Sequence, residues 1–207
     1  MGSEMCIRDR FRGIRDYTGN DSLKNVNWKA TARTGNLMVN EYDESVSRNV
    51  CILLNLEEDG VLRYDAVDEQ AISIAAGISQ MLIACGINVS MLSNGCDVDT
   101  KSPVVINNGS GIGHLNNINT ALARIDTGIT MEEYSAMLEK IFEPDNMRIE
   151  SEYVYVLISA SRRKKLQSVI NKISRLQADM VWIVPHFPGD DYGLELCDFE
   201  PVGWEVK

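Results

Sequence analysis

The chain has 207 residues, of which 44% are hydrophobic and 24% are charged, and its formal net charge is -10 at pH 7. This length supplies one substantial hydrophobic core and not two, so we expect a single main globular domain. An acidic chain argues against nucleic-acid binding, which needs lysine and arginine clustered on one face, and no run approaches the roughly 18 apolar residues of a membrane-spanning helix.

The first part of the chain is polar and rich in turn-forming residues. Residues 17–22 predict a turn, because Gly and Asn accept positive φ most readily. A short helix is expected over residues 23–32 with Trp28 facing inward, and Gly35 should end it. An extended element then follows over residues 37–42.

Beyond residue 48, apolar runs typical of buried strands alternate with segments of helical periodicity. The predicted strands are Val50–Leu54, Asn88–Leu92, Tyr153–Ile158 and Met180–Val184. The predicted helices are Asp65–Cys85, His114–Ile125, Thr130–Phe142 with Thr130 and Glu133 as a capping box, and a last one through Leu166–Leu176. This alternation predicts an α/β domain of the Rossmann type, with a mostly parallel sheet covered by helices on both faces.

Ligands of such a sheet bind beyond the carboxyl ends of its strands. The loops that would form a site are therefore residues 55–59, 93–99 and 159–163. The final segment, residues 187–207, is acidic and punctuated by Gly and Pro, and we expect a terminal loop with one edge strand around Trp204.

Several residues of the polar N-terminal part form a recognisable pattern. They are Arg12-Gly13, Arg15, Tyr17, Asp21-Ser22-Leu23-Lys24, Trp28-Lys29, Ala32-Arg33 and Leu37-Met38-Val39 with Glu41-Tyr42. With this spacing the chain resembles the domain of unknown function 58 family, whose members carry a von Willebrand factor A-like domain and accompany MoxR-type AAA+ ATPases. One position departs from the family pattern: Asn20 stands where Gly usually precedes the Asp, and Asn is the best non-Gly substitute for a left-handed backbone.

The resemblance implies an organisation of the chain. Residues 1–10 do not look like the family and are interpreted as a non-native remnant, residues 11–48 form the family's signature segment, residues 49–186 the von Willebrand A-like domain, and residues 187–207 a tail. Family members run to about twice this length with apolar segments near the N-terminus. The chain is therefore expected to be a truncated member, the cytoplasmic domain of a membrane-anchored parent.

The resemblance also implies a function, which is protein binding and not catalysis, without a cofactor. The expected partner is a MoxR-type AAA+ ATPase that assists the assembly or maturation of other proteins. The signature residues expected either to contact this partner or to clasp the segment against the sheet are Arg15, Tyr17, Asp21, Trp28, Lys29 and Arg33.

A metal-binding von Willebrand A domain needs an Asp-x-Ser-x-Ser loop after its first strand, because Mg²⁺ prefers carboxylate and hydroxyl oxygens. Here the loop is Asn55-Leu56-Glu57-Glu58-Asp59, without the serines, and Ala160 stands at the later carboxylate position. We interpret it as a degenerate metal site and a solvated acidic loop. The alternative is that Asn55, Glu57 and Asp59 present oxygens together, which would make the domain a metal- or small-ligand-binding sensor or an enzyme.

Four other motifs favour structural interpretations. The scattered cysteines predict reduced thiols, and the glycines of residues 109–113 predict a flexible surface loop. Ser159, His186 and Asp190 form no recognisable hydrolase motif. The basic run of residues 162–165 predicts the solvated first turn of a helix, whose cations oppose the helix dipole and could instead serve a partner's carboxylates.

Overall fold

The computed structural model describes residues 11–18, 26–42, 49–57, 65–143, 153–176, 179–190 and 201–206. The chain divides into two compact units, Met1–Val46 and Ser47–Lys207.

The first unit consists of two strands and one short helix in its described part. Strand β1 (Phe11–Asp16) pairs antiparallel with β2 (Met38–Tyr42), and helix α1 (Trp28–Thr34) lies between them in sequence. Asn27 caps α1, since its side-chain oxygen accepts a hydrogen bond from the Ala30 amide at 2.9 Å. Gly35 ends the helix with a φ of 74°, a left-handed conformation that favours glycine.

Predictions for this unit met with mixed outcomes. The extended element after Leu37 is confirmed as β2. The helix was expected too early, because Asn27 fixes its start one residue before Trp28. The inward orientation of Trp28 is wrong, since 67% of this residue is exposed. The turn at residues 17–22 lies mostly outside the described residues.

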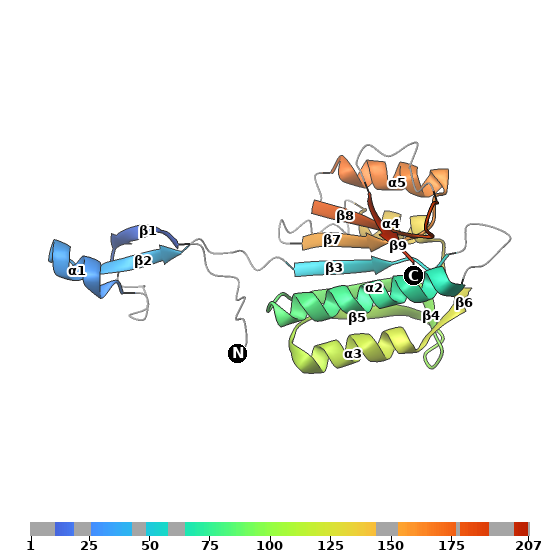
Figure 1. The fold of residues 1–207 in the computed structure, drawn as a ribbon, viewed down its shortest axis with the longest axis horizontal. Coiled ribbons are helices and arrows are strands. Elements are labelled where there is room, and N and C mark those ends of the chain that lie inside the picture. Colours follow the sequence, from blue (N-terminus) through green and yellow to red (C-terminus); the bar gives the residue numbers. More distant parts are fainter. Residues whose placement is uncertain are drawn as a thin grey trace. The chain divides into compact units, whose positions relative to one another are not determined.

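The second unit is built on a sheet with strand order β5-β4-β3-β7-β8-β9, in which β6 also pairs with β4 (Figure 1). Its strands are β3 (Asn49–Leu54), β4 (Val89–Asp97), β5 (Pro103–Gly109), β6 (Ile125–Thr130), β7 (Tyr153–Ile158), β8 (Asp179–His186) and β9 (Val202–Glu205). Its helices are α2 (Asp65–Ala84), α3 (Gly111–Ala123), α4 (Tyr134–Ile141) and α5 (Lys164–Ser174). Adjacent strands in the series β4-β3-β7-β8-β9 run parallel to one another. Strands β5 and β6 run antiparallel to β4.

Helices cover both faces of this sheet. Ile52 and Leu54 of β3 pack in the core beneath α2 and α3, whereas Cys51 and Leu53 pack in the core beneath α4 and α5. Successive side chains of a strand point to opposite faces, which explains why β3 is apolar throughout. The predicted fold class, a mostly parallel α/β sheet of the Rossmann type, is confirmed.

The structure confirms the predicted strands and adds two that were not predicted. The four predicted strands are present, as is the edge strand around Trp204, now β9. Strand β4 extends to Asp97 through residues that were expected to form a loop, and β5 and β6 were not predicted. Strand β6 carries Asp and Gly, which strand propensities disfavour, whereas β5 contains the strand-favouring run Val104-Val105-Ile106 before its Asn and Gly residues. Both strands pair with β4.

The predicted surface loop at the glycines of residues 109–113 and the predicted helix cap at Thr130 are both wrong. Gly109 closes β5, and Gly111 and Gly113 lie in the first turn of α3, so this stretch is not a free surface loop. An added Cβ at Gly109 would lie 2.8 Å from His114 Nδ1, which accounts for glycine there. Thr130 belongs to β6 and caps no helix, because α4 begins only at Tyr134. None of the described helices has the length and apolar character needed to cross a membrane.

Candidate functional site

Strands β3 and β7 lie side by side at the centre of the sheet, and their carboxyl ends mark the place where the strand order changes direction. The chain passes from β3 to β4 on one side, and later strands extend from β7 on the other side. Connections that leave in opposite directions open a crevice at this point, where ligands of such folds bind. Asn55 and Ser159 are the first residues after these two strands.

Buried amide and hydroxyl groups fill this position. Asn55 Nδ2 donates to Ser159 Oγ at 2.8 Å, and Asn94 Nδ2 donates to Asn55 Oδ1 at 2.9 Å. The Leu56 amide donates to Asn94 Oδ1, and the Glu57 amide donates to Asn55 Oδ1, both at 2.9 Å. Asn55, Asn94 and Ser159 are at most 4% exposed. We call these three side chains the switch-point network.

The switch-point network does not fit a divalent cation. Asn55 Oδ1 already accepts from two donors, and Ser159 Oγ accepts from Asn55 and from the Ser161 amide. Mg²⁺ favours ionised carboxylates, and this network contains neutral groups only. Within the described ranges no three His, Cys, Asp or Glu residues gather in an arrangement suited to a metal ion.

Of the three candidate metal residues, the two that the structure describes, Asn55 and Glu57, have side-chain oxygens that accept hydrogen bonds from this same chain. Asn55 lies in the network, and the carboxylate of Glu57 is used elsewhere, since Oε2 accepts from the Tyr134 amide at 3.0 Å and Oε1 pairs with Arg163. Asp59 lies outside the described residues. Glu57 thus connects the loop after β3 to the start of α4 and to the start of α5.

Ion pairs surround the network at this edge of the sheet. Lys165 Nζ lies 2.5 Å from Glu133 Oε2, and Arg162 lies 4.0 Å from Asp190. The hydrogen bond from Lys165, together with one from Ser135, lowers the pKa of Glu133, and the same contact raises the pKa of Lys165. The basic run of residues 162–165 is consequently not simply solvated, because carboxylates of this same chain face it.

A second carboxylate, Asp97, stabilises the turn after β4. Its oxygens accept hydrogen bonds from the Thr100 amide at 3.0 Å, from the Asp99 amide at 2.8 Å and from the Arg124 guanidinium at 2.7 Å. These bonds, the Thr100 amide first among them, lower the pKa of Asp97. The role of Asp97 is to hold β4 and the start of β6 together.

The Ser159, His186 and Asp190 side chains form no hydrolytic arrangement of the kind a nucleophile needs. Ser159 Oγ is hydrogen-bonded to Asn55 and to the Ser161 amide, not to a histidine. His186 Nδ1 lies 3.0 Å from the Phe187 carbonyl oxygen.

The signature residues lie in the first unit. Arg15 is exposed on β1, and Tyr17 follows β1 with its amide bonded to the Leu37 carbonyl at 2.8 Å. Trp28, Lys29 and Arg33 all belong to α1 and are exposed there. Asp21 lies outside the described residues. Asn94 is the site residue that the sequence pattern did not single out, although the loop expected at residues 93–99 contained it.

Comparison with solved structures finds remote similarities. The chain is similar to proximal thread matrix protein 1 from the mussel byssus, with a TM-score of 0.44 and 8% identity over 66% of this chain and 37% of that chain. It is also similar to an aerotolerance-related membrane protein from Bacteroides fragilis NCTC 9343 carrying multiple mutations to serines, with a TM-score of 0.42 and 13% identity over 73% of this chain and 75% of that chain. The chain thus spans little more than a third of the mussel protein.

No curated protein matches the chain. A family model, by contrast, matches residues 13–175, which is well over half of the sequence and includes nearly all of the signature segment and strands β3 to β7 of the second unit. The chain belongs to the family described as Protein of unknown function DUF58.

Proposed function

We propose that this chain is a protein-binding module without catalytic or metal chemistry, which works with a MoxR-type AAA+ ATPase in the assembly or maturation of other proteins. Membership of the family supports the proposal, because the resemblance on which the partner rests runs through the signature segment. The same reasoning makes the chain the cytoplasmic part of a membrane-anchored parent.

The observation that carries the proposal is the self-contained switch-point network. A domain that recognises a partner through a bound metal needs free oxygen ligands at the carboxyl ends of its strands. The side-chain oxygens of Asn55, Asn94 and Ser159 accept hydrogen bonds from one another's amide groups and from nearby backbone amides. These contacts favour recognition through protein surfaces over recognition through a bound metal.

Direct binding to the ATPase tests the proposal. The chain is immobilised and the purified MoxR-type ATPase from the same organism is titrated over it by biolayer interferometry, with an unrelated AAA+ ATPase as the control. We expect saturable binding to the MoxR-type protein alone. Equal binding to both ATPases, or to neither, would contradict the proposal.

A further inference from the structure

Helix α1 presents one continuous exposed face. Consecutive residues of an α-helix are rotated by about 100°, so positions 28, 29, 32 and 33 fall within an arc of about 140°. All four are exposed. On the opposite side Ala30 and Thr31 are half-buried, and Thr34 at the end of the helix is exposed. The exposed side chains on this arc are Trp28, Lys29, Ala32 and Arg33, which we call the α1 face.

Polar contacts hold α1 in place, so the Trp28 ring is not needed for its packing. Asn27 caps one end, the Gly35 amide donates to the Thr31 carbonyl at the other, and Thr31 Oγ1 accepts from the Met38 amide at 3.0 Å. The buried apolar side chains in the described part of this unit are Val26 and Val39. Trp28 therefore stands outside the small core with 67% of its surface exposed.

With 67% of its surface exposed, Trp28 offers a large apolar ring that a partner could bury. Tryptophan and arginine are the residue types most enriched among those that dominate binding energy at interfaces. Isolated exposed aliphatic residues are common on protein surfaces, whereas a tryptophan and an arginine exposed on one helix face are residue types that interfaces favour.

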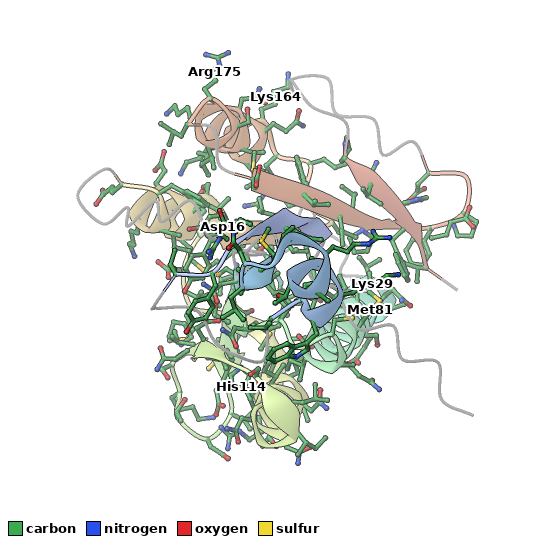
Figure 2. All side chains as sticks on the ribbon, turned by 90° about the vertical axis from the view of Figure 1, so that its left-hand side faces the viewer. Asp16, Lys29, Met81, His114, Lys164 and Arg175 are labelled. Atoms are coloured by element: carbon green, nitrogen blue, oxygen red, sulfur yellow. The ribbon has the colours of Figure 1, made fainter. Side chains whose placement is uncertain are left out.

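The charge of the α1 face indicates the character of the partner. Lys29 and Arg33 are four residues apart, where like charges weakly destabilise a helix. None of the ion pairs in the described part of the chain involves either of them, and the first turn of α1 contains no acidic residue. Figure 2 shows Lys29 and Asp16, the acidic residue of β1, on different sides of this unit. The face is thus locally basic in a chain of net charge -10.

We propose that the α1 face binds an acidic surface on the partner, with Trp28 inserted into an apolar pocket and Lys29 and Arg33 paired with carboxylates at its rim. This inference rests on the proposed function, because it names the surface and the chemistry by which the module would hold the ATPase. It assigns the signature residues of α1 to partner contact.

The test uses three changes and one matched control in the interferometry assay. Trp28→Ala removes the anchor, Trp28→Phe retains part of it, and the pair Lys29→Glu with Arg33→Glu reverses the charge. The control is Lys164→Glu with Arg175→Glu, which makes the same change of net charge on exposed residues of and beside α5 (Figure 2). Thermal unfolding of every variant is measured in parallel.

We expect Trp28→Ala to weaken binding about thirty-fold and Trp28→Phe less, as for a central interface residue. Charge reversal should weaken binding at least tenfold and abolish the loss of affinity that wild type shows when salt rises from about 0.05 M to about 0.5 M. The control should bind within about twofold of wild type, as surface charges away from an interface do.

Two results would overturn the inference. Wild-type binding that none of the α1 variants changes would place the contact elsewhere and leave the proposed function standing. A Trp28→Ala chain whose midpoint of thermal unfolding falls by more than about 5 °C would show that the ring packs within the chain, as in the clasp interpretation. Absence of binding by the wild-type chain is a different outcome, because it removes the proposed function itself.

Discussion

Replacing Asn94 with alanine removes the centre of the switch-point network and gives a measurable prediction. The Asn94 side chain is fully buried, accepts from the Leu56 amide at 2.9 Å and donates to Asn55 Oδ1 at 2.9 Å. After the substitution, the buried Leu56 amide has lost its acceptor, which costs about 1–3 kcal/mol, and the lost bond to Asn55 adds roughly 1 kcal/mol. We therefore expect the free energy of unfolding to fall by about 2–4 kcal/mol.

Urea unfolding followed by far-ultraviolet circular dichroism measures this loss, because helices α2 to α5 of the second unit dominate the signal. With a slope of about 2 kcal/mol per molar, the midpoint should fall by about 1–2 M urea. Asn108→Ala is the matched control, since Asn108 Nδ2 also donates to an asparagine, Asn49 Oδ1, at 2.9 Å, but at an exposed position. The control should lose no more than about 0.5 kcal/mol. An Asn94→Ala chain as stable as that control would refute the claim that the network is a closed, buried unit.

Three further predictions follow from other contacts. Glu57→Ala should lower the free energy of unfolding by about 1–2 kcal/mol, because it removes the acceptor at the start of α4 and the partner of Arg163. Glu57→Gln should lower it less, because an acceptor remains. Equal losses of the two variants in urea unfolding would contradict this. Gly109→Ala should lower the free energy of unfolding by about 1–3 kcal/mol, because the added Cβ meets the His114 ring. In a His114→Ala background the same substitution should lower it much less. An unchanged loss in the double variant would show that the ring is not the obstacle. The carboxyl of Asp97, whose pKa is lowered by folding, contributes stability above its unfolded pKa of about 3.9 that is lost as pH falls through the folded pKa. Asp97→Asn should therefore flatten the acid side of the stability profile, and a profile identical to wild type below about pH 4 would contradict the assignment.

The predictable part of the fold is the part with continuous apolar strands and strong helical periodicity. Val50–Leu54 is apolar on both faces because cores lie on both faces, so its sequence alone indicated a central strand of a covered sheet. Strands β5 and β6 pair antiparallel with β4. The apolar run of β5 is only three residues long, Val104-Val105-Ile106, and β6 carries Asp and Gly, so neither has the continuous apolar character of β3. Tertiary pairing determines these strands more than local propensity does.

The candidate site was predictable in position and not in its contacts. The rule for ligand sites in α/β sheets directed attention to the loops that contain Asn55, Asn94 and Ser159. The sequence also revealed that the serines of a metal loop are missing. It did not reveal that Asn94 reaches across to Asn55, or that Glu57 pairs with Arg163, because these partners are 39 and 106 residues apart in the chain.

The orientation of Trp28 was predicted incorrectly. An aromatic residue in a short helix is usually buried, so an inward orientation was expected. The Asn27 cap, the Gly35 turn and the Thr31 hydroxyl anchor α1 without the ring, and these local polar contacts leave it exposed.

Titration of the isolated chain with Mg²⁺ and with Mn²⁺ in a calorimeter tests the central claim most directly. The oxygens of Asn55 and Ser159 are already engaged by donors of this protein, so we expect only the heat of dilution. A saturable one-to-one isotherm that Asn55→Ala abolishes would contradict the account and restore a metal-dependent site at the ends of β3 and β7.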